Sequence, residues 1–403
     1  MSRSVVISGL GVISAAGQDV PAFWDSLKSG RSAIRPMQPA VDGVKITTAA
    51  QLQDYQPEEH FSAEDLSLLD RYAQMAVIAA REAVADAGLA KDDAALAGAA
   101  AIVGSGCCAK NTDEDTCIQL YQKERKRVHP LTIPKGMPSA AASMVSYHLG
   151  IKGPAFVLSS ACSSGSHAII QGMSMISSGM ADVAVVGATD APFTFGLLKS
   201  WDALRVVSAD TCRPFSKDRS GLILGEGAAM LVLESREHAE QRGATIYAEL
   251  AGCGMSSDAG HITRPDVEGI STAMTQAMQQ AGIAAGELDY INAHGTGTQL
   301  NDATETQAIQ RVLGEHAENV AISSTKAIHG HALGASSALE LVATALTMKH
   351  GIIPPTVNYS EADEECPLDY VPNSAREQTV DTAISNSFAF GGLNAVIALK
   401  KIK

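Results

Sequence analysis

The cysteine at position 162 has the surroundings that nucleophilic sulfur chemistry needs. Its stretch, Ser159–Ser166 (SSACSSGS), follows a short apolar run predicted as a strand and opens a segment predicted as a helix. A cysteine at a helix start lies among unpaired backbone N–H groups and at the positive end of the helix dipole, and both favour the reactive thiolate. The small flanking residues would let a thioester approach closely. A buried structural cysteine is the alternative, and this stretch alone does not decide between the two.

Two histidines in glycine-containing segments could act together with such a thiol. His294 follows a short apolar strand within Asn292–Thr298 (NAHGTGT), a loop of glycines and hydroxyls. His331 ends the segment Lys326–His331 (KAIHGH) and stands before a predicted helix rich in small residues. Taken alone, each histidine is more readily explained by a structural role. One thiol and two histidines at strand-to-helix junctions, however, form the constellation that acyl transfer requires.

Alternating strands and helices along the chain must position these residues. Apolar β-rich runs are predicted as strands at 4–12, 99–104, 155–158, 182–187, 228–233, 247–253, 290–293, 320–323, 383–388 and 395–399. Helices are predicted at 65–87, 138–149, 162–179, 267–281, 303–313 and 331–349. This alternation predicts an α/β protein whose helices pack on a largely buried sheet. The acidic stretch 361–365 (EADEE) is interpreted as a solvated connection.

Two glycine pairs give only weak evidence for a nucleotide-binding site. Gly9–Gly11 superficially resembles the start of a dinucleotide-binding turn, but Ser14 stands where the third glycine is needed. We therefore interpret these glycines as a tight turn packed on the sheet, and Gly104–Gly106 in the same way.

Composition and charge narrow the class of protein. Of 403 residues, 46% are hydrophobic but only 4% aromatic, and 35 are glycine, which favours a tightly packed α/β enzyme over a β-sandwich. The net charge of −14 disfavours nucleic acid as a partner. No apolar stretch is long enough for a membrane span and residues 1–13 lack a signal-peptide pattern, so we expect a cytoplasmic protein. Its seven cysteines are then expected to be free thiols.

The chemistry-bearing segments together resemble one known enzyme family. SSACSSG around Cys162, NAHGTGT around His294 and KAIHGHALGA from Lys326 match, in order and approximate spacing, the β-ketoacyl synthases. Further matches are RPFSKDRSGLILGEG from 213 to 227, NSFAFGG from 386 to 392, and the opening VVISGLGVISAAG. These matches cover nearly the whole chain, so it is identified as a member of the β-ketoacyl-acyl carrier protein synthase family. Because two histidines accompany the cysteine, it resembles the elongating type.

The resemblance implies the thiolase fold, in which two similar βαβαβαββ halves stack as five α-β-α-β-α layers. We expect residues 1–245 to form the half that carries the nucleophilic cysteine and residues 246–403 the half that carries both histidines. A dimer is also implied, either of two copies or with a related chain-length-factor subunit.

The resemblance further implies an acyltransferase of EC 2.3.1 type. Cys162 would receive an acyl chain from acyl carrier protein, and the carbanion formed when malonyl carrier protein loses carbon dioxide would attack that thioester. The backbone N–H groups of Cys162 and Phe390 would form an oxyanion hole. His294 and His331, each neutral with a proton on Nε2, would stabilise the enolate. No cofactor is implied, because the substrates arrive on phosphopantetheine.

Other residues match positions that support these roles. Lys326 and Glu340 would support the histidine network, and Asp302 and Glu305 would order the His294 loop. Dipole-stabilised acids at a helix start are an equally good explanation of that last pair. The residues implied in substrate binding are Thr296, Thr298, Phe388, Cys107 and Thr132. His329 is assigned to the surface or the cavity lining rather than to catalysis.

Partners and substrate are less closely defined. A basic cluster on this acidic chain is interpreted as a docking site for the acidic carrier protein at the mouth of the substrate tunnel, and consists of Lys123, Arg125, Lys126 and Arg127. Small groups at Cys107 and Thr132 would widen the acyl pocket, so we expect a specialised synthase for a long, rigid or aryl-type chain, as in polyene synthesis. Three alternatives are a non-elongating chain-length factor, a thiolase-like enzyme that uses coenzyme A thioesters, and, remotely, a metal hydrolase built on His329 and His331.

Overall fold

In the computed structural model, which describes residues 3–91 and 93–402, two successive halves of the chain build sheets of identical topology. The first half contributes β1 (Val5–Ser14), β4 (Ala100–Gly104), β5 (Ala155–Leu158), β6 (Val183–Asp190) and β7 (Gly227–Ser235), in the spatial order β5-β4-β6-β7-β1. The second contributes β8 (Ala248–Ser257), β9 (Tyr290–Asn292), β10 (Ala321–Ser323), β13 (Thr382–Ala389) and β14 (Leu393–Lys400), in the order β10-β9-β13-β14-β8. When the strands are numbered within their own half, both sheets have the same spatial order: third, second, fourth, fifth, first.

The strand directions repeat as well. In each half the second strand is parallel to the third and fourth, whereas the fifth runs antiparallel to both of its neighbours. The two sheets join edge to edge where β1 pairs with β8, through Val6 with Glu249 and Ile7 with Ala248. The duplication of a βαβαβαββ unit is therefore confirmed. Residue 245 lies in the connection between α10 (Arg236–Gln241) and β8.

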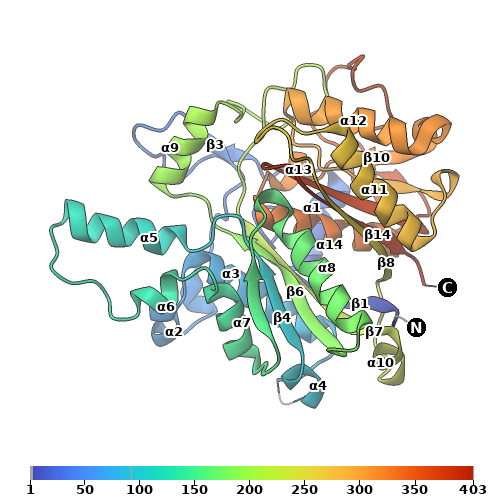
Figure 1. Cartoon of the computed structure of the whole chain (residues 1–403). Coiled ribbons are helices and arrows are strands. Elements are labelled where there is room, and N and C mark those ends of the chain that lie inside the picture. Colours follow the sequence, from blue (N-terminus) through green and yellow to red (C-terminus); the bar gives the residue numbers. More distant parts are fainter. Residues whose placement is uncertain (1–2, 92, 403) are drawn as a thin grey trace.

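The longer helices complete five layers (Figure 1). One outer layer packs on the first sheet and contains α3 (Arg71–Asp86) and α7 (Ala140–Leu149). The central layer contains α8 (Ser164–Ser177) and α14 (Gly334–His350), and the other outer layer α11 (Val267–Ala281) and α12 (Gln299–Leu313). In α14 every residue from Gly334 to Met348 is buried, as expected of a helix with small and apolar side chains on all faces. The predicted thiolase-type α/β fold is confirmed.

Shorter elements decorate these layers. The short helices are α1 (Val20–Ser29), α2 (Ala63–Leu68), α4 (Ala94–Ala97), α5 (Lys110–Cys117), α6 (Thr132–Gly136), α9 (Phe195–Leu204) and α13 (Lys326–His329). The two-residue strands are β2 (Arg35–Pro36), β3 (Thr48–Ala49), β11 (Ile352–Ile353) and β12 (Arg376–Glu377). The segment from α5 to α6 projects from the body as an arm (Figure 1). Within the described ranges, the helices are too short or too polar to cross a membrane.

Three sequence predictions about local structure are wrong. The helix expected over 65–87 is two helices, because Asp70 caps α3 and accepts hydrogen bonds from Tyr72 N at 3.2 Å and Thr112 N at 2.7 Å. The helix expected from 331 begins only at Gly334. The stretch 361–365 is not merely solvated, since Asp363 pairs with the fully buried guanidinium of Arg219.

The interpretation of Gly9–Gly11 as a turn is also wrong. Both glycines lie within strand β1, where the carbonyl oxygen of Ala79 in α3 would be 1.9 Å from a Cβ on Gly11. The second half repeats the device, because a Cβ on Gly254 of β8 would lie 1.9 Å from Ala273 O in α11. The glycines let each outer helix approach its sheet closely.

We expect Gly11→Ala to destabilise the protein by about 3 kcal/mol or more, because the new methyl group collides with backbone that has no room to move. Denaturant unfolding would measure this. The control Gly98→Ala meets only ordinary contacts, with Ala94 O at 3.5 Å, and should change the free energy of unfolding by less than about 0.5 kcal/mol. Equal effects of the two substitutions would contradict the packing argument.

Candidate active site

Cys162 lies at the head of the central helix α8, where β5 leads into a short 3-10 turn, Ala161–Ser163. Ala161 adopts a φ of +50°, a conformation that non-glycine residues rarely adopt, so the chain turns sharply just before the cysteine. The Cys162 side chain is buried, and burial raises the pKa of the thiol to about 11. The Lys326 ammonium and the backbone N–H of Phe390 act in the opposite direction. The expectation that the helix start alone would favour the thiolate is therefore wrong for the unliganded protein, because desolvation outweighs it.

His294 sits in the loop after β9, and its ring nitrogens are distinguished by Lys326. The Lys326 ammonium lies 3.3 Å from His294 Nδ1 and donates to the His294 carbonyl oxygen at 2.6 Å. An ammonium only donates hydrogen bonds, so Nδ1 is the acceptor and the ring proton is on Nε2. Burial, together with the charge of Lys326, holds the pKa of His294 well below its usual range. The ring is thus a neutral N–H donor.

His331 is also a neutral ring with its proton on Nε2, but a different contact fixes its tautomer. The backbone N–H of Leu333 donates to His331 Nδ1 at 3.2 Å, and Ser336 Oγ lies 3.0 Å from the same nitrogen. The ring proton is therefore again on Nε2. Burial and the Lys326 charge hold the pKa of His331 well below its ordinary value. The two rings lie with centroids 5.6 Å apart and nearly perpendicular, at 87°.

A buried ion pair stands behind the histidines. Lys326 in α13 and Glu340 in α14 are both fully buried, and the ammonium contacts the Glu340 carboxylate directly. Burial raises the pKa of Glu340 to about 7, against the influence of Lys326. Lys326 thus joins a carboxylate of α14 to the ring and backbone of His294.

Two further buried carboxylates hold the His294 loop. The oxygens of Glu305 accept the backbone N–H groups of His294 and Gly295, each at 2.8 Å. Asp302 accepts from Phe215 N at 2.8 Å and Gly297 N at 3.3 Å. Both acids lie in the first half of α12, but the structure aims their side chains at this loop rather than at solvent.

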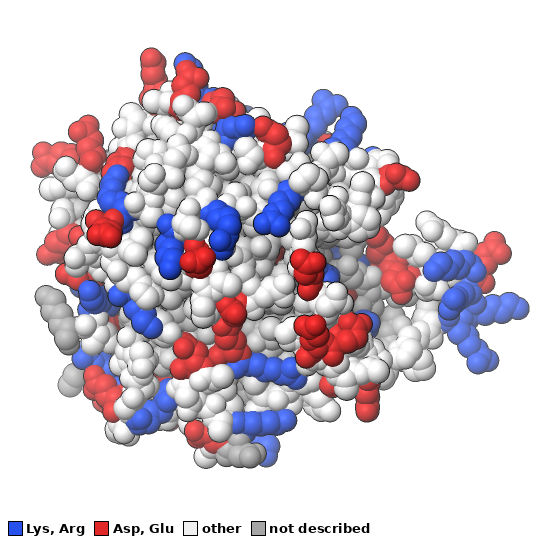
Figure 2. All heavy atoms as spheres, turned by 180° about the vertical axis from the view of Figure 1, so that it is seen from behind, with Lys and Arg blue, Asp and Glu red and all other residues white. Residues whose placement is uncertain are grey.

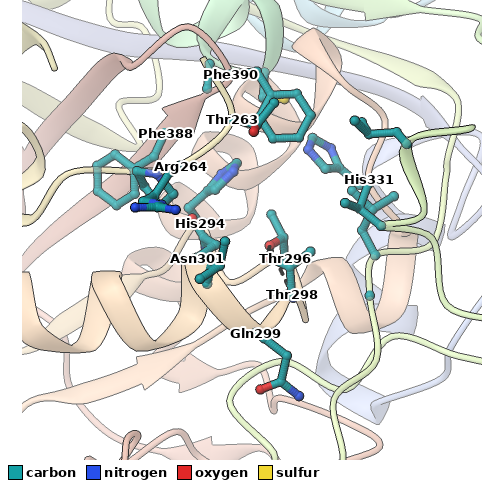
Figure 3. Close-up of a pocket in the computed structure, with 18 of the residues that line it drawn as sticks. Thr263, Arg264, His294, Thr296, Thr298, Gln299, Asn301, His331, Phe388 and Phe390 are labelled. Atoms are coloured by element: carbon teal, nitrogen blue, oxygen red, sulfur yellow. Dashed lines mark hydrogen bonds between the residues drawn. The ribbon is translucent and has the colours of Figure 1, made fainter. Parts of the chain in front are cut away.

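A cavity of about 350 Å³ opens over these groups (Figure 3). The residues that line it include Cys162 and both histidines. Other lining side chains are Thr296, Thr298, Gln299, Asn301, Phe388 and Phe390. The lining residues that sequence reasoning missed include Trp201, Arg205 and Arg264. Trp201 stacks on Phe390 with ring centroids 6.3 Å apart, whereas both arginines are exposed. The local sequence around Arg205 or Arg264 gives no sign that the residue lines the cavity, because the two segments come together only in the folded protein.

Other expected site residues lie away from this cavity. Cys107 is buried behind it, where its thiol donates to Asp190 at 3.0 Å, and Thr132 lies on the projecting arm. His329 is neither at the surface nor in the lining, since it is fully buried with its two nitrogens bonded to Gly330 O and Thr325 Oγ1.

The basic cluster of the arm is fully exposed and does not line the cavity mouth of its own chain. Its side chains project at the right of Figure 2, and the residues are Lys123, Arg125, Lys126 and Arg127. The expected place of the cluster at the tunnel mouth is therefore wrong for a single chain.

Comparison with known proteins gives consistent matches along the chain. Residues 2–239 match the family Beta-ketoacyl synthase, N-terminal domain, and residues 247–360 match Beta-ketoacyl synthase, C-terminal domain. Nodulation protein E of Rhizobium sp. (strain N33) is 47% identical, with 100% of both chains covered. The 3-oxoacyl-[acyl-carrier-protein] synthase 2 of Coxiella burnetii (strain RSA 493 / Nine Mile phase I) is 39% identical, with 99% of each covered. Among solved structures, the ishigamide ketosynthase/chain length factor superimposes with a TM-score of 0.95 at 37% identity, covering 100% of both chains.

Alkylation of Cys162 by iodoacetamide is expected to keep rising from about pH 8 to about pH 10, where an ordinary thiol has levelled off. The reason is that only the thiolate reacts and burial raises this thiol's pKa to about 11. Lys326→Met should slow the reaction at every pH in this range, since the nearby ammonium favours the thiolate. Peptide mass spectrometry would follow Cys162, with the exposed Cys117 as an internal reference for the reagent. A plateau reached by about pH 10, as an ordinary thiol shows, would contradict this assignment.

Proposed function

The chain belongs to the β-ketoacyl synthase family, and from this premise we propose that Cys162 is its nucleophile and that His294 and His331 form its decarboxylation site. The enzyme is an acyltransferase that carries out the β-ketoacyl-acyl carrier protein synthase condensation of fatty acid or polyketide synthesis. An acyl thioester and malonyl-acyl carrier protein give carbon dioxide and a chain two carbons longer. The residue roles that follow are part of the proposal.

Acyl transfer begins at Cys162. Its sulfur attacks the carbonyl carbon of acyl-carrier protein, the carrier's thiol leaves, and the acyl group remains on Sγ. The negative charge on the thioester oxygen is held by the N–H groups of Cys162 and Phe390, each worth about 3–4 kcal/mol in such sites. Supporting this role, the backbone N–H of Phe390 acts to lower the pKa of the thiol in the unliganded protein.

Decarboxylation uses the paired histidines, and their geometry is the observation that carries the proposal. Two neutral Nε2–H groups from nearly perpendicular rings converge in one cavity with Cys162. They donate to the thioester carbonyl of the malonyl group as its C–C bond to the carboxylate breaks, so that the electron pair is held as an enolate. The enolate carbon then attacks the acyl thioester, a C–C bond forms, and the Cys162 sulfur leaves.

Lys326 and Glu340 keep both donors in this state. A protonated histidine would also donate, but its positive charge is disfavoured beside the buried ammonium. We propose that Thr296 and Thr298, whose hydroxyls lie 2.9 Å apart on the cavity wall, contact the phosphopantetheine arm, with Phe388 beside it.

We propose a specialised acyl substrate, a long and rigid chain of polyene type. The apolar cluster that surrounds Cys107 supports this. That cluster contains Met37, Ile46, Leu198, Leu222, Leu224 and Leu333, and opening it would lengthen the acyl pocket.

We also propose a dimer, either of two copies or with a chain-length-factor subunit. The edge strand β5 is only partly buried, and the neighbouring arm exposes Tyr121 (79%) and Ile133 (77%), which a partner subunit would cover. In such a dimer the arm would bring Thr132 and the basic cluster toward the partner's cavity. The exposed Arg205 and Arg264 of the mouth would add to the attraction for an acidic carrier protein. The cytoplasmic location expected from the sequence belongs to the same proposal.

Of the alternatives, a chain-length factor is disfavoured by the complete set of Cys162, His294 and His331 in one cavity. A thiolase-like enzyme would need a second catalytic cysteine. Cys162 is the one cysteine among the described residues that line the cavity.

Intact-mass spectrometry after incubation with a panel of acyl-carrier protein thioesters would test the function. We expect an acyl adduct on the wild-type protein, none on Cys162→Ala, and a 3-oxoacyl product once malonyl carrier protein is added. Polyenoyl donors should react faster than saturated ones of equal length. An adduct that survives in Cys162→Ala would overturn the assignment of the nucleophile.

Two comparisons within that experiment test the partner proposals. The first comparison uses acyl pantetheine in place of acyl carrier protein, because this small substrate needs no docking surface. The double variant Lys126→Glu with Arg127→Glu should therefore slow the reaction with acyl carrier protein but not the reaction with acyl pantetheine. The second comparison repeats the assay with a candidate chain-length-factor subunit. Activity that appears only with this subunit shows that the chain needs a partner, whereas no activity in either assay shows that the chain lacks the proposed function.

A further inference from the structure

One buried carboxylate beside the site has no part in the mechanism above. Asp190 is the last residue of β6 and is fully buried. One of its oxygens, Oδ1, accepts from Ser105 Oγ at 2.7 Å and from Cys107 N at 2.9 Å and Sγ at 3.0 Å. The other, Oδ2, accepts from Gly106 N at 2.8 Å and Gly334 N at 2.7 Å. All five contacts are donors, which an ionised carboxylate accepts in full.

These bonds join the two halves of the protein directly behind the reacting groups. Gly106 follows β4 in the first half, and Gly334 is the first residue of α14 in the second. A Cβ on Gly334 would lie 2.7 Å from Gly106 N and 2.9 Å from Asp190 Oδ2. A Cβ on Gly106 would lie 3.4 Å from Ala161 O, the residue before the nucleophile. A Cβ on Gly104 would lie 2.4 Å from Ser164 O, so the Gly104–Gly106 segment is a close-packed contact rather than just a turn.

The contact between Asp190 and Gly334 affects His331 through Leu333, the residue before Gly334. Leu333 and Gly334 present consecutive N–H groups, the first to His331 Nδ1 and the second to Asp190. Leu333 itself has a φ of +49° and a ψ of −123°, which costs free energy for a side chain other than glycine. Such a conformation persists only where neighbouring bonds enforce it. Asp190 supplies one of those bonds and His331 the other.

We propose that Asp190 is a positioning residue for His331: its carboxylate holds the start of α14 so that the Leu333 N–H fixes the histidine ring for decarboxylation. The inference rests on the proposed function and deepens it. It separates the two half-reactions, because the α14 start is hydrogen-bonded to His331 through Leu333, whereas the Cys162 turn meets α14 only by packing. The Asp190 charge raises the pKa of the Cys162 thiol, so its removal would not itself slow acylation. Loss of the Asp190 acceptor should therefore impair decarboxylation more than acylation.

The test measures both half-reactions on the same preparations, carbon dioxide release from malonyl carrier protein and acyl adduct formation on Cys162. Asp190→Ala should lower decarboxylation by up to about a hundredfold, the loss that a misplacement of about 1 Å can cause. Acylation should stay within about threefold of the wild type, roughly the scatter expected of an indirect effect. Asp190→Asn should recover part of the decarboxylation rate, because its amide oxygen can still accept from Gly106 N and Gly334 N. Recovery is incomplete because its NH₂ donates to Ser105 Oγ but cannot accept from Cys107 N.

Glu234→Ala is the matched control. Glu234 is also a fully buried carboxylate, but it pairs with Arg242 and His238 at the end of β7. Its loss should lower stability without changing the ratio of the two half-reactions. If Asp190→Ala does not fold, Gly334→Ala pushes the same contact apart and should give the same selective loss.

The inference is overturned if Asp190→Ala, or Gly334→Ala in its place, lowers both half-reactions in parallel or changes neither. It is also overturned if Asp190→Asn is as impaired in decarboxylation as Asp190→Ala. A wild-type protein that performs neither half-reaction would instead overturn the proposed function, and the inference with it.

Discussion

The buried ammonium of Lys326 is the interaction on which the site depends. It is fully buried, contacts the Glu340 carboxylate and lies 3.3 Å from His294 Nδ1. An ammonium so far from water is tolerable only because these partners and the His294 carbonyl surround it. In return it imposes one tautomer on His294, disfavours a positive charge on both histidines and lowers the cost of forming a thiolate at Cys162. One charge thus acts on the protonation of all three groups that react, in each case beside the larger effect of burial.

Backbone N–H groups bound by buried acids fix the geometry around that charge. Glu305 holds the His294 loop, Asp302 ties this loop to the segment at Phe215, and Asp190 holds the start of the helix behind His331. Each acid is fully buried and accepts at least two backbone N–H donors. The site is therefore built where loops of the two halves meet, and the central helices α8 and α14 give it a rigid base.

Much of this arrangement could be predicted from the sequence. Cys162, His294 and His331 stand in segments of small residues and glycines whose order is distinctive, and the structure brings all three into one cavity. The alternating strands and helices predicted the α/β class, and the paired glycines of β1 and β8 in fact mark the duplication. Gly9 and Gly11 were interpreted as a turn because a close helix-to-sheet approach leaves the same sequence signal as a tight bend.

What escaped prediction depends on long-range contacts. Asp190 looks like any residue at a strand end until five donors from two distant segments converge on it. Arg205 and Arg264 come from unrelated loops, and His329 was assigned to the surface or the cavity lining although tertiary packing buries it completely. The pKa of Cys162 was misjudged for a related reason: a helix start is visible in the sequence, whereas the depth of burial is not.

The central claim is that both histidines are neutral and carry their proton on Nε2 before any substrate binds. Nitrogen-15 NMR of protein labelled at histidine, with His294→Gln and His331→Gln to assign the signals, measures this directly at about pH 6.5, the ordinary histidine pKa. The account predicts for both rings an unprotonated Nδ1 and a protonated Nε2, and a changed Nδ1 signal for His294 in Lys326→Met. A doubly protonated ring, or a proton on Nδ1 of either histidine, would contradict it.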